Sequence, residues 1–126
     1  MVGEKLGEFF FPGEFVDLNK YINAERGHFS KAAKIKKDET TRVYYDLIGK
    51  MPINEYPVKI HFFWRLKNDK IDPDNIAFAK KYILDGMVEA RVLQGDGWDR
   101  IRGFSDDFEV NPKDVGVVVV VYKFEE

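Results

Sequence analysis

The most regular pattern in the chain is an alternation of side chains over residues 56–67. Every second position is apolar, and the positions between are mostly basic; the two sets are Val58, Ile60, Phe62, Trp64, Leu66 and Lys59, His61, Phe63, Arg65, Lys67. A period of two sends the sets to opposite faces of a β-strand. The pattern therefore predicts a strand with one face in the core. Its other face either meets the phosphates and bases of a nucleic acid or is the ordinary wet side of an antiparallel strand.

Three other segments have the composition of strands. Residues 6–11 form a short apolar run that Pro12-Gly13 ends, and residues 98–108 place arginines on both sides of Ile101. Residues 115–124 are rich in valine and almost continuously apolar. Such a run is typical of a strand inside a sheet with both faces covered.

Two helices are predicted from apolar side chains that recur every three or four residues. The first begins at Ser30, a good N-cap residue, and ends at Gly49, which Pro52 follows. The second begins at Asp72 and buries a stripe of five side chains: Ile76, Ala79, Ile83, Met87 and Ala90. Residues 15–24 are polar and irregular, and they are predicted to form a loop.

The opposite side of the second helix carries charge. On a helical wheel Asp74, Lys81 and Asp85 lie together there, either as a functional group of side chains or as a solvated face. Phe78 and Tyr82 lie off the buried stripe, and they predict a second contact surface such as that with a dimer partner.

The order strand, helix, strand, helix, strand, strand predicts a single α+β domain over residues 1–126, with two helices packed on a mixed sheet. A length of 126 residues, 44% of them hydrophobic, suits one core. The absence of cysteine excludes disulfides and zinc–thiolate sites, and two histidines leave carboxylates as the main ligands for any metal. No apolar run suits a membrane span and no signal-peptide pattern is present, so the cytoplasm is the expected compartment.

Charge is divided unevenly along the chain, although the net charge is only −2. Residues 26–42 hold six Lys and Arg against two Asp and Glu, and residues 59–70 hold four against one. Residues 71–126 reverse the balance, with twelve acidic against seven basic side chains. Basic segments that precede an acidic one suit an anionic substrate brought to a metal site.

The stretch Asp72-Pro73-Asp74-Asn75 concentrates the candidate chemistry. Asp72 stands at a helix N-cap, Pro73 fits the first helical position, and Asp74 lies in the first turn, where negative charge is favoured. Two carboxylates one residue apart at such a junction can converge on Mg²⁺, which takes oxygen ligands. The alternative is that Asp72 is only a cap and Asp74 only a surface charge.

These motifs resemble those of the RusA family of Holliday junction resolvases, small and often phage-borne endonucleases of DNA recombination and repair. Asp72-Pro73-Asp74-Asn75 is similar to the family's Asp-x-Asp-Asn signature, and the segment from Lys81 to Met87 is similar to its lysine and helix end. Asp96, in a glycine-flanked turn, matches the third catalytic carboxylate, and Asn19 is similar to an asparagine of the N-terminal loop. The resemblance covers about residues 58–101.

The resemblance implies a homodimeric, metal-dependent hydrolase that cuts paired phosphodiester bonds in a four-way junction. Asp72, Asp74 and Asp96 of one subunit would be catalytic and would hold Mg²⁺, with Mn²⁺ as a substitute. Lys81 would neutralise phosphate charge or steady the attacking water. The residues expected to bind DNA are Asn19, Lys31, Lys34, Lys37, His61, Arg65 and Lys67.

The spacing leaves the identity of the catalytic lysine open. Between Asp74 and Asp85 the chain holds three more residues than the type member of the family, so either Lys80 or Lys81 can take the position of the family's lysine. The helical wheel favours Lys81. The remaining acidic side chains expected at surface or turn positions are Asp69, Asp99, Asp106 and Asp107.

Three other functions stay open from the sequence. A nuclease of broader specificity for branches or flaps would use the same residues. A non-catalytic DNA-structure-binding protein would keep the fold, with the carboxylates as caps and turn residues. A small structural or interaction protein would lack strongly salt-dependent binding to DNA.

Overall fold

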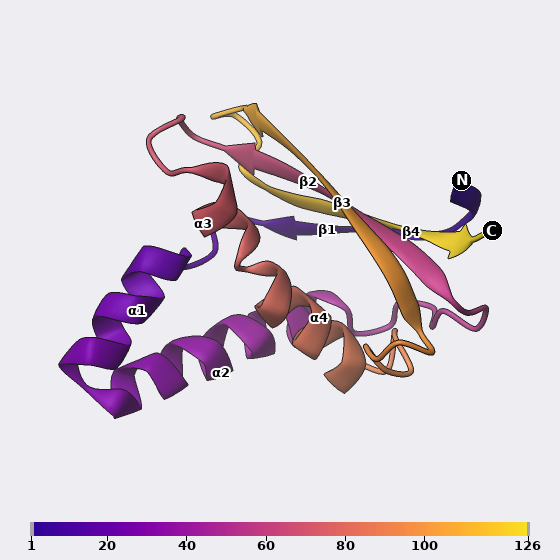
Figure 1. Ribbon diagram of the computed structural model, residues 1–126, viewed down its shortest axis with the longest axis horizontal. Helices are drawn as coiled ribbons and strands as arrows, with labels where there is room; N and C mark the ends of the chain where they lie inside the picture. Colours follow the sequence, from indigo (N-terminus) through magenta and orange to yellow (C-terminus); the bar gives the residue numbers. More distant parts are fainter. Residues whose placement is uncertain (1, 126) are drawn as a thin grey trace.

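A computed structural model, which describes residues 2–125, places a layer of helices against one face of a four-stranded sheet (Figure 1). The strands are β1 (Val2–Pro12), β2 (Val58–Leu66), β3 (Ile101–Val110) and β4 (Gly116–Phe124). The helices are α1 (Leu18–Gly27), α2 (Phe29–Asp46), α3 (Pro73–Ala77) and α4 (Lys80–Glu89). The predicted α+β class is confirmed. The second of the two predicted helices is interrupted between α3 and α4, and a helix that was not predicted, α1, precedes the first.

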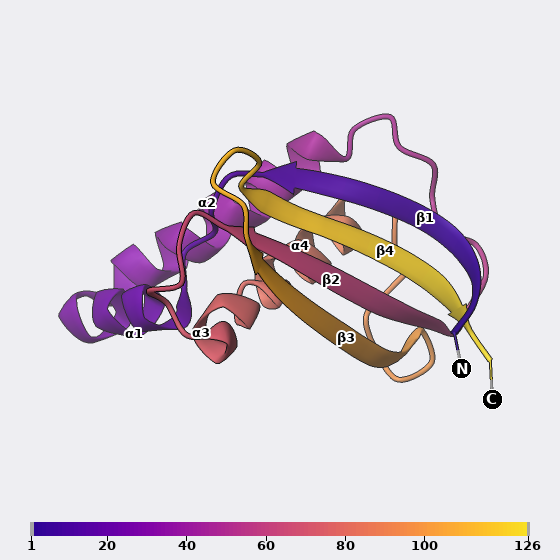
Figure 2. The ribbon, with the colours of Figure 1, turned by 90° about the horizontal axis from the view of Figure 1, so that it is seen from above.

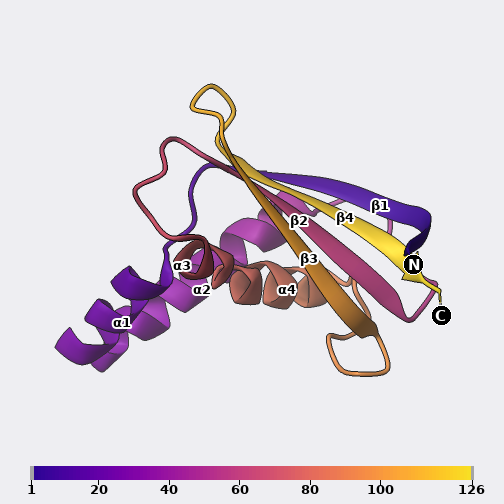
Figure 3. The ribbon, with the colours of Figure 1, turned by 45° about the horizontal axis from the view of Figure 1, so that its top comes forward.

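The strand order in the sheet is β1-β4-β2-β3 (Figure 2). Strand β4 pairs antiparallel with β1 and β2, whereas β2 and β3 pair in parallel. Parallel neighbours need a crossover connection, which α3 and α4 supply between β2 and β3. Strand β4 is an interior strand, as its valine-rich sequence predicts. The helices, however, lie on one side of the sheet only, so the predicted cover of β4 on both faces is not found within residues 2–125 (Figure 3).

The core lies between the sheet and the helices α2 and α4. On β2 the side chains of Val58, Ile60 and Phe62 are fully buried, which confirms the face that the alternation predicts. Helices α2 and α4 pack closely at Gly86, where a Cβ would stand 2.5 Å from Val43 Cγ1. This contact leaves room for glycine alone between the two helices.

The predicted loop at residues 15–24 is wrong, because helix α1 begins at Leu18. Asp17 is its N-cap and accepts the Lys20 N–H at 3.0 Å. None of the α1 side chains is buried, so the helix has no buried stripe for a periodicity argument to detect. The N-cap of the next helix is His28, two residues before the predicted N-cap Ser30, and its Nδ1 accepts the Ser30 N–H at 3.3 Å.

The predicted helix from Asp72 onward is interrupted between α3 and α4, at Phe78 and Ala79. The second contact surface that Phe78 and Tyr82 predict is occupied within the chain itself. The ring of Phe78 lies 5.3 Å from that of Tyr21 in α1 and 5.6 Å from that of Tyr82, and Tyr82 is only 1% exposed. These aromatic side chains attach α1 to the rest of the molecule.

The Tyr82 hydroxyl is buried and has no hydrogen-bond partner among the described residues. Desolvation raises the pKa of Tyr82, and the nearby charge of Glu39 raises it further, so the phenol stays neutral. Tyr56, in contrast, donates to the Ile53 carbonyl at 2.8 Å and accepts the Gln94 N–H at 2.9 Å. The two tyrosines therefore offer a matched pair for mutation.

We expect Tyr82→Phe to leave the free energy of unfolding unchanged or to raise it, because the substitution removes an unpaired buried polar group. We expect Tyr56→Phe to lower it by about 1–2 kcal/mol, because a bridging hydroxyl is lost and the Gln94 N–H is left without its acceptor. Urea denaturation of the two variants measures the difference. A larger loss for Tyr82→Phe than for Tyr56→Phe would contradict this account.

Candidate functional site

Two segments far apart in the sequence meet beside the start of α3. A surface cleft, called the α1–α3 cleft below, is lined by Asp17, Asn19, Lys20, Asn23, Lys70, Ile71, Asp72 and Asn75. Its polar lining consists of two carboxylates, three amides and two amines. The structure thus brings together Asn19 and Asp72, which the sequence assigned to the same function from separate motifs.

Asp72 occupies the N-cap position of α3 through its backbone only. Its φ and ψ of −67° and 147° are extended, and Pro73 follows in the first turn. Its carbonyl accepts the Asn75 N–H at 3.0 Å, whereas its carboxylate makes no capping hydrogen bond. Asp74 accepts the same N–H through Oδ1 at 2.9 Å. Capping therefore does not account for the Asp72 carboxylate.

Asp17 belongs to the α1–α3 cleft and was missed by the sequence reasoning. It is 6% exposed, its Oδ1 caps α1, and its Oδ2 lies 3.9 Å from Lys20 Nζ. A signal was present, because aspartate is among the preferred N-cap residues. It was overlooked because the helix that follows has no buried apolar stripe.

Asp96 lies outside the α1–α3 cleft. It follows the C-terminal end of α4, while Asp72 and Asp74 stand at the start of α3, and the two places lie at opposite ends of the α3–α4 segment (Figures 1 and 3). A second cleft, between α2 and α4, is lined by Asp96 together with Lys36, Lys37, Thr40, Lys81, Asp85, Glu89 and neighbours. The structure therefore groups Lys81 with Asp96 and separates Asp96 from the Asp72–Asp74 pair.

The two candidate lysines have different surroundings. Lys80 Nζ lies 2.8 Å from Asp106 Oδ2, and the other oxygen of Asp106 accepts the Trp64 Nε1–H at 2.9 Å. Lys80 thereby ties α4 to β2 and β3, and only 19% of its side chain is exposed. Lys81 is 55% exposed and lies 3.2 Å from Asp85. Of the two, Lys81 is the one that can reach a ligand from solvent.

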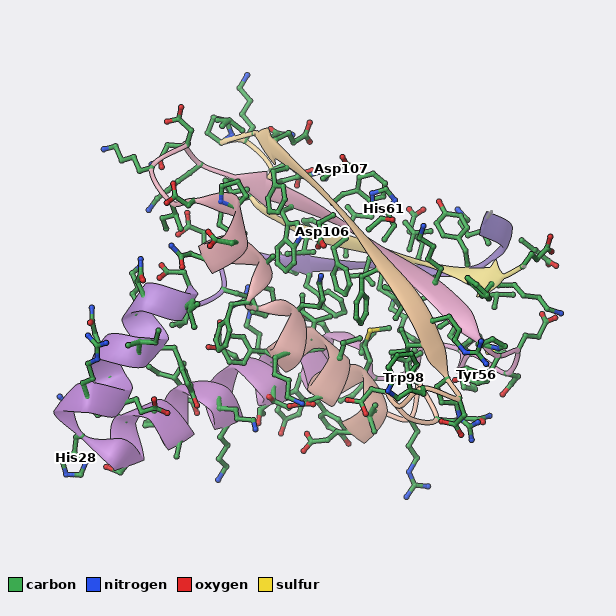
Figure 4. All side chains as sticks on the ribbon, in the orientation of Figure 1. His28, Tyr56, His61, Trp98, Asp106 and Asp107 are labelled. Carbon is green, nitrogen blue, oxygen red and sulfur yellow. The ribbon has the colours of Figure 1, made fainter. Side chains whose placement is uncertain are left out.

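Asp106 differs from the surface or turn position that was predicted for it. It lies on β3 with 24% of its side chain exposed, on the side of the sheet that carries the helices (Figure 4). Its neighbour Asp107 points to the other side, where its Oδ2 lies 2.6 Å from His61 Nε2. Adjacent aspartates on a strand thus serve opposite faces of the sheet.

The basic face of β2 is largely neutralised by carboxylates. Besides the His61–Asp107 pair, Arg65 contacts Glu109 on β3 at 3.4 Å and Asp114 in the following turn. Lys67 lies 3.7 Å from Glu14. Strand β3 lies beside β2, with Arg65 opposite Glu109 in the register, and it places acidic side chains against the basic ones. This face consequently has little net positive charge to attract phosphate.

The lysines of α2 remain the most accessible cations of the predicted DNA-binding set. Lys31 and Lys37 are exposed, and Lys34 is exposed while it pairs with Asp38 at 2.6 Å. Lys37 also lines the cleft between α2 and α4. The positive surface therefore lies on the helical layer, the same layer that carries both clefts.

Within residues 2–125 there is no group of three or more His, Asp or Glu side chains placed to hold a metal ion. Over the same range, no helix combines the length and apolar character that crossing a bilayer requires. No family model matches the sequence, and no curated protein is significantly similar to it. The residues and their placement in the fold are therefore what indicates a function.

Proposed function

We propose that this chain is a metal-dependent endonuclease of branched DNA, with the four-way junction as substrate and paired phosphodiester hydrolysis as reaction. The observation that supports it most is the α1–α3 cleft, where Asn19 lies together with Asp72 of the Asp-x-Asp-Asn motif. The Asp72 carboxylate makes no capping hydrogen bond, which leaves it available for a ligand. An aspartate that served only as a helix cap would need neither the neighbouring Asn19 nor a carboxylate free of capping hydrogen bonds.

The donor atoms at this end of the molecule suit a hard cation. Asp72 offers carboxylate oxygens in the α1–α3 cleft, and Asn19 and Asn75 offer amide oxygens there, the ligand types that Mg²⁺ prefers. Asp74 does not line the cleft but lies beside it, in the first turn of α3. When bound, Mg²⁺ or Mn²⁺ would activate a water near neutral pH and neutralise charge on the scissile phosphate. Asp72 and Asp74 would hold the ion, and Lys70 on the cleft wall would attract the phosphate backbone.

DNA away from the reacting bond would follow the helical layer. Lys31 and Lys37 on α2 would contact phosphates, and Lys81 would do so from the first turn of α4. His61 and Arg65 would contribute less, because carboxylates of this chain already pair with them. The proposal therefore places most of the DNA contacts on α2 rather than on β2.

Within one chain, Asp96 does not lie with Asp72 and Asp74, so the three carboxylates do not form one site. Asp96 can join Asp72 and Asp74 only if a second subunit or a rearrangement on DNA brings it to them. Asp96→Asn distinguishes these arrangements from a two-carboxylate site. A loss of cleavage as deep as that of Asp74→Asn would support a third carboxylate from elsewhere, whereas retained cleavage would restrict the site to Asp72 and Asp74.

The test of the proposed function is cleavage of a labelled synthetic four-way junction beside a linear duplex of matched sequence, with Mg²⁺ and with EDTA. Paired symmetric nicks in the junction, absent with EDTA, are the expected result. Nicks in flaps or other branches at equal rates would indicate a broader branch nuclease. Salt-dependent junction binding without cleavage would indicate a non-catalytic binder of DNA structure.

Millimolar Mg²⁺ or Mn²⁺ is expected to raise the melting temperature of the protein. Carboxylates held close together repel one another, and a ligand at about a hundred times its Kd stabilises the folded state by about 2.7 kcal/mol. Thermal melts with and without metal measure the shift. The double variant Asp72→Asn/Asp74→Asn is the control and should show none; a wild-type melt that metal leaves unmoved would contradict a metal site.

A further inference from the structure

The outer face of the sheet, the side turned away from the helices, carries an apolar row. Val118 on β4 pairs with Phe10 on β1 and with Phe63 on β2, so the three side chains lie side by side across three strands. Val120 and Tyr122 extend the row along β4 and line a hollow with Val118 and Phe63. Phe10 is 42% exposed, although it stands in the middle of a strand. Exposed apolar surface that spans several strands marks an interaction site.

Most charged side chains that border this row are paired within the chain; Lys59, opposite Tyr122, has no ion pair among the described residues. The pairs are His61 with Asp107 at 2.6 Å, Arg65 with Glu109 at 3.4 Å, and Lys5 with Glu8 at 3.1 Å. Balanced charge of this kind gives little attraction for a polyanion such as DNA. It also gives little repulsion between two identical surfaces. The outer face is therefore suited to a protein surface of the same character, and the chain itself provides one.

We propose that the outer face is the interface between two copies of this chain, with their sheets packed face to face. Sheets pack about 10 Å apart with strands turned by about 30°, which lets apolar rows from both sides interdigitate. Strands of nine or more residues at about 3.3 Å per residue, four abreast at about 4.8 Å, present roughly 600 Å² before side chains are counted. That approaches the roughly 800 Å² per partner of a stable interface.

This arrangement explains why β4 is apolar on both faces. Val119 and Val121 face the helices and are fully buried. On the outer face Val120 is already 4% exposed in one chain, while Val118 and Tyr122 on either side of it are only half-buried. A second sheet would bury them, as the sequence of an interior strand requires. The inference rests on the proposed function and extends it by naming the dimer surface. Each subunit's α1–α3 cleft would face outward, away from its partner, so this dimer would leave a rearrangement on DNA as the way for Asp96 to join Asp72 and Asp74.

Sedimentation velocity of the full chain over a range of concentrations tests the interface without DNA. Val118→Asp places a charge at the centre of the row, and Phe10→Asp places one at a position that is already exposed and therefore tolerant. Each is expected to weaken dimerisation by about thirtyfold or more, as loss of an interface hot spot does. The controls are Trp98→Asp and Ile48→Asp, which alter apolar side chains that are 88% and 62% exposed at other places.

Circular dichroism establishes whether each variant is folded. If Val118→Asp is unfolded, the effect of Phe10→Asp on dimerisation alone tests the interface. A wild-type dimer that both outer-face variants dissociate and both controls preserve would support the inference. A wild-type monomer at high micromolar concentration, or a dimer that survives Phe10→Asp, would overturn it. Junction cleavage by a monomer would overturn the interface while leaving the proposed function intact, so the two can fail separately.

Discussion

Asp74→Asn is expected to abolish junction cleavage while the protein stays folded and bound to DNA. A metal ion contributes several kcal/mol of charge stabilisation in the transition state, and about 1.4 kcal/mol corresponds to tenfold in rate, so the loss should be about a hundredfold or more. Asparagine keeps the oxygen that accepts the Asn75 N–H, so the first turn of α3 can persist. Binding should be unchanged or stronger, because a negative charge beside the phosphate is removed.

Asp69→Asn is the matched control for Asp74→Asn. It makes the same chemical change to an exposed residue just upstream of the motif, with the same effect on net charge. Cleavage rate on the four-way junction and the Kd for the junction, measured for both variants, separate catalysis from binding. Full cleavage by Asp74→Asn would mean that Asp74 has no part in catalysis and serves only as a negative charge that stabilises the N-terminus of α3.

Gly86→Ala is expected to destabilise the fold although alanine is the better helix former. An added Cβ would stand 2.5 Å from Val43 Cγ1, 2.6 Å from Val43 Cβ and 3.0 Å from the Thr40 carbonyl oxygen. The backbone atom cannot move without shifting α2. Overpacking of this kind costs about 1–3 kcal/mol, which opposes the gain of about 1 kcal/mol from helix propensity. We expect a lower melting temperature and a lower urea midpoint.

Two further variants make the Gly86→Ala prediction specific. Gly27→Ala adds the same methyl group at the end of α1, where nothing lies within 4 Å, and should stabilise the protein by up to about 1 kcal/mol. Val43→Ala removes the Cγ1 atom that the new methyl group would strike but keeps the Val43 Cβ at 2.6 Å, so it should recover only part of the loss when combined with Gly86→Ala. A Gly86→Ala protein as stable as wild type would show that α2 and α4 do not cross this closely.

The parts of the fold that depend on the pattern of apolar side chains along one strand were predictable from the sequence. Alternation identified the buried face of β2, and the valine run identified β4 as interior, because both signals arise from burial within one strand. Helix α1 was not predictable in this way, because none of its side chains is buried. The only signal in the sequence was Asp17, a residue type that is preferred at the N-cap of a helix. The helix is interrupted at Phe78, whose ring contacts Tyr21 in another helix, and the periodicity of one segment carries no information about such a contact.

The sequence predicted which residues belong to the candidate site better than it predicted which of them the fold brings together. The motif at Asp72 and the asparagine at position 19 were both selected, and the fold brings them into one cleft. The separation of Asp96 was not predicted, because Asp96 was grouped with Asp72 and Asp74 through the family resemblance. A helix that begins at Asp72 and ends before Asp96 already places the two at opposite ends, since it rises by about 1.5 Å per residue. The neutralisation of Arg65 by Glu109 depends on the parallel pairing of β2 with β3, which only the topology supplies.

The position of β4 has a consequence for how the protein is made. It is the last strand of the sheet to be synthesised, yet it forms the centre, and both β1 and β2 depend on it for their hydrogen bonds. Until residues 116–124 have left the ribosome, β1 has no neighbour in the sheet, and β2 is left with β3 alone. Pairing between the first and last strands is also the most distant contact in sequence, which slows folding. The chain is therefore most prone to aggregation before β4 has been synthesised and has paired with β1 and β2.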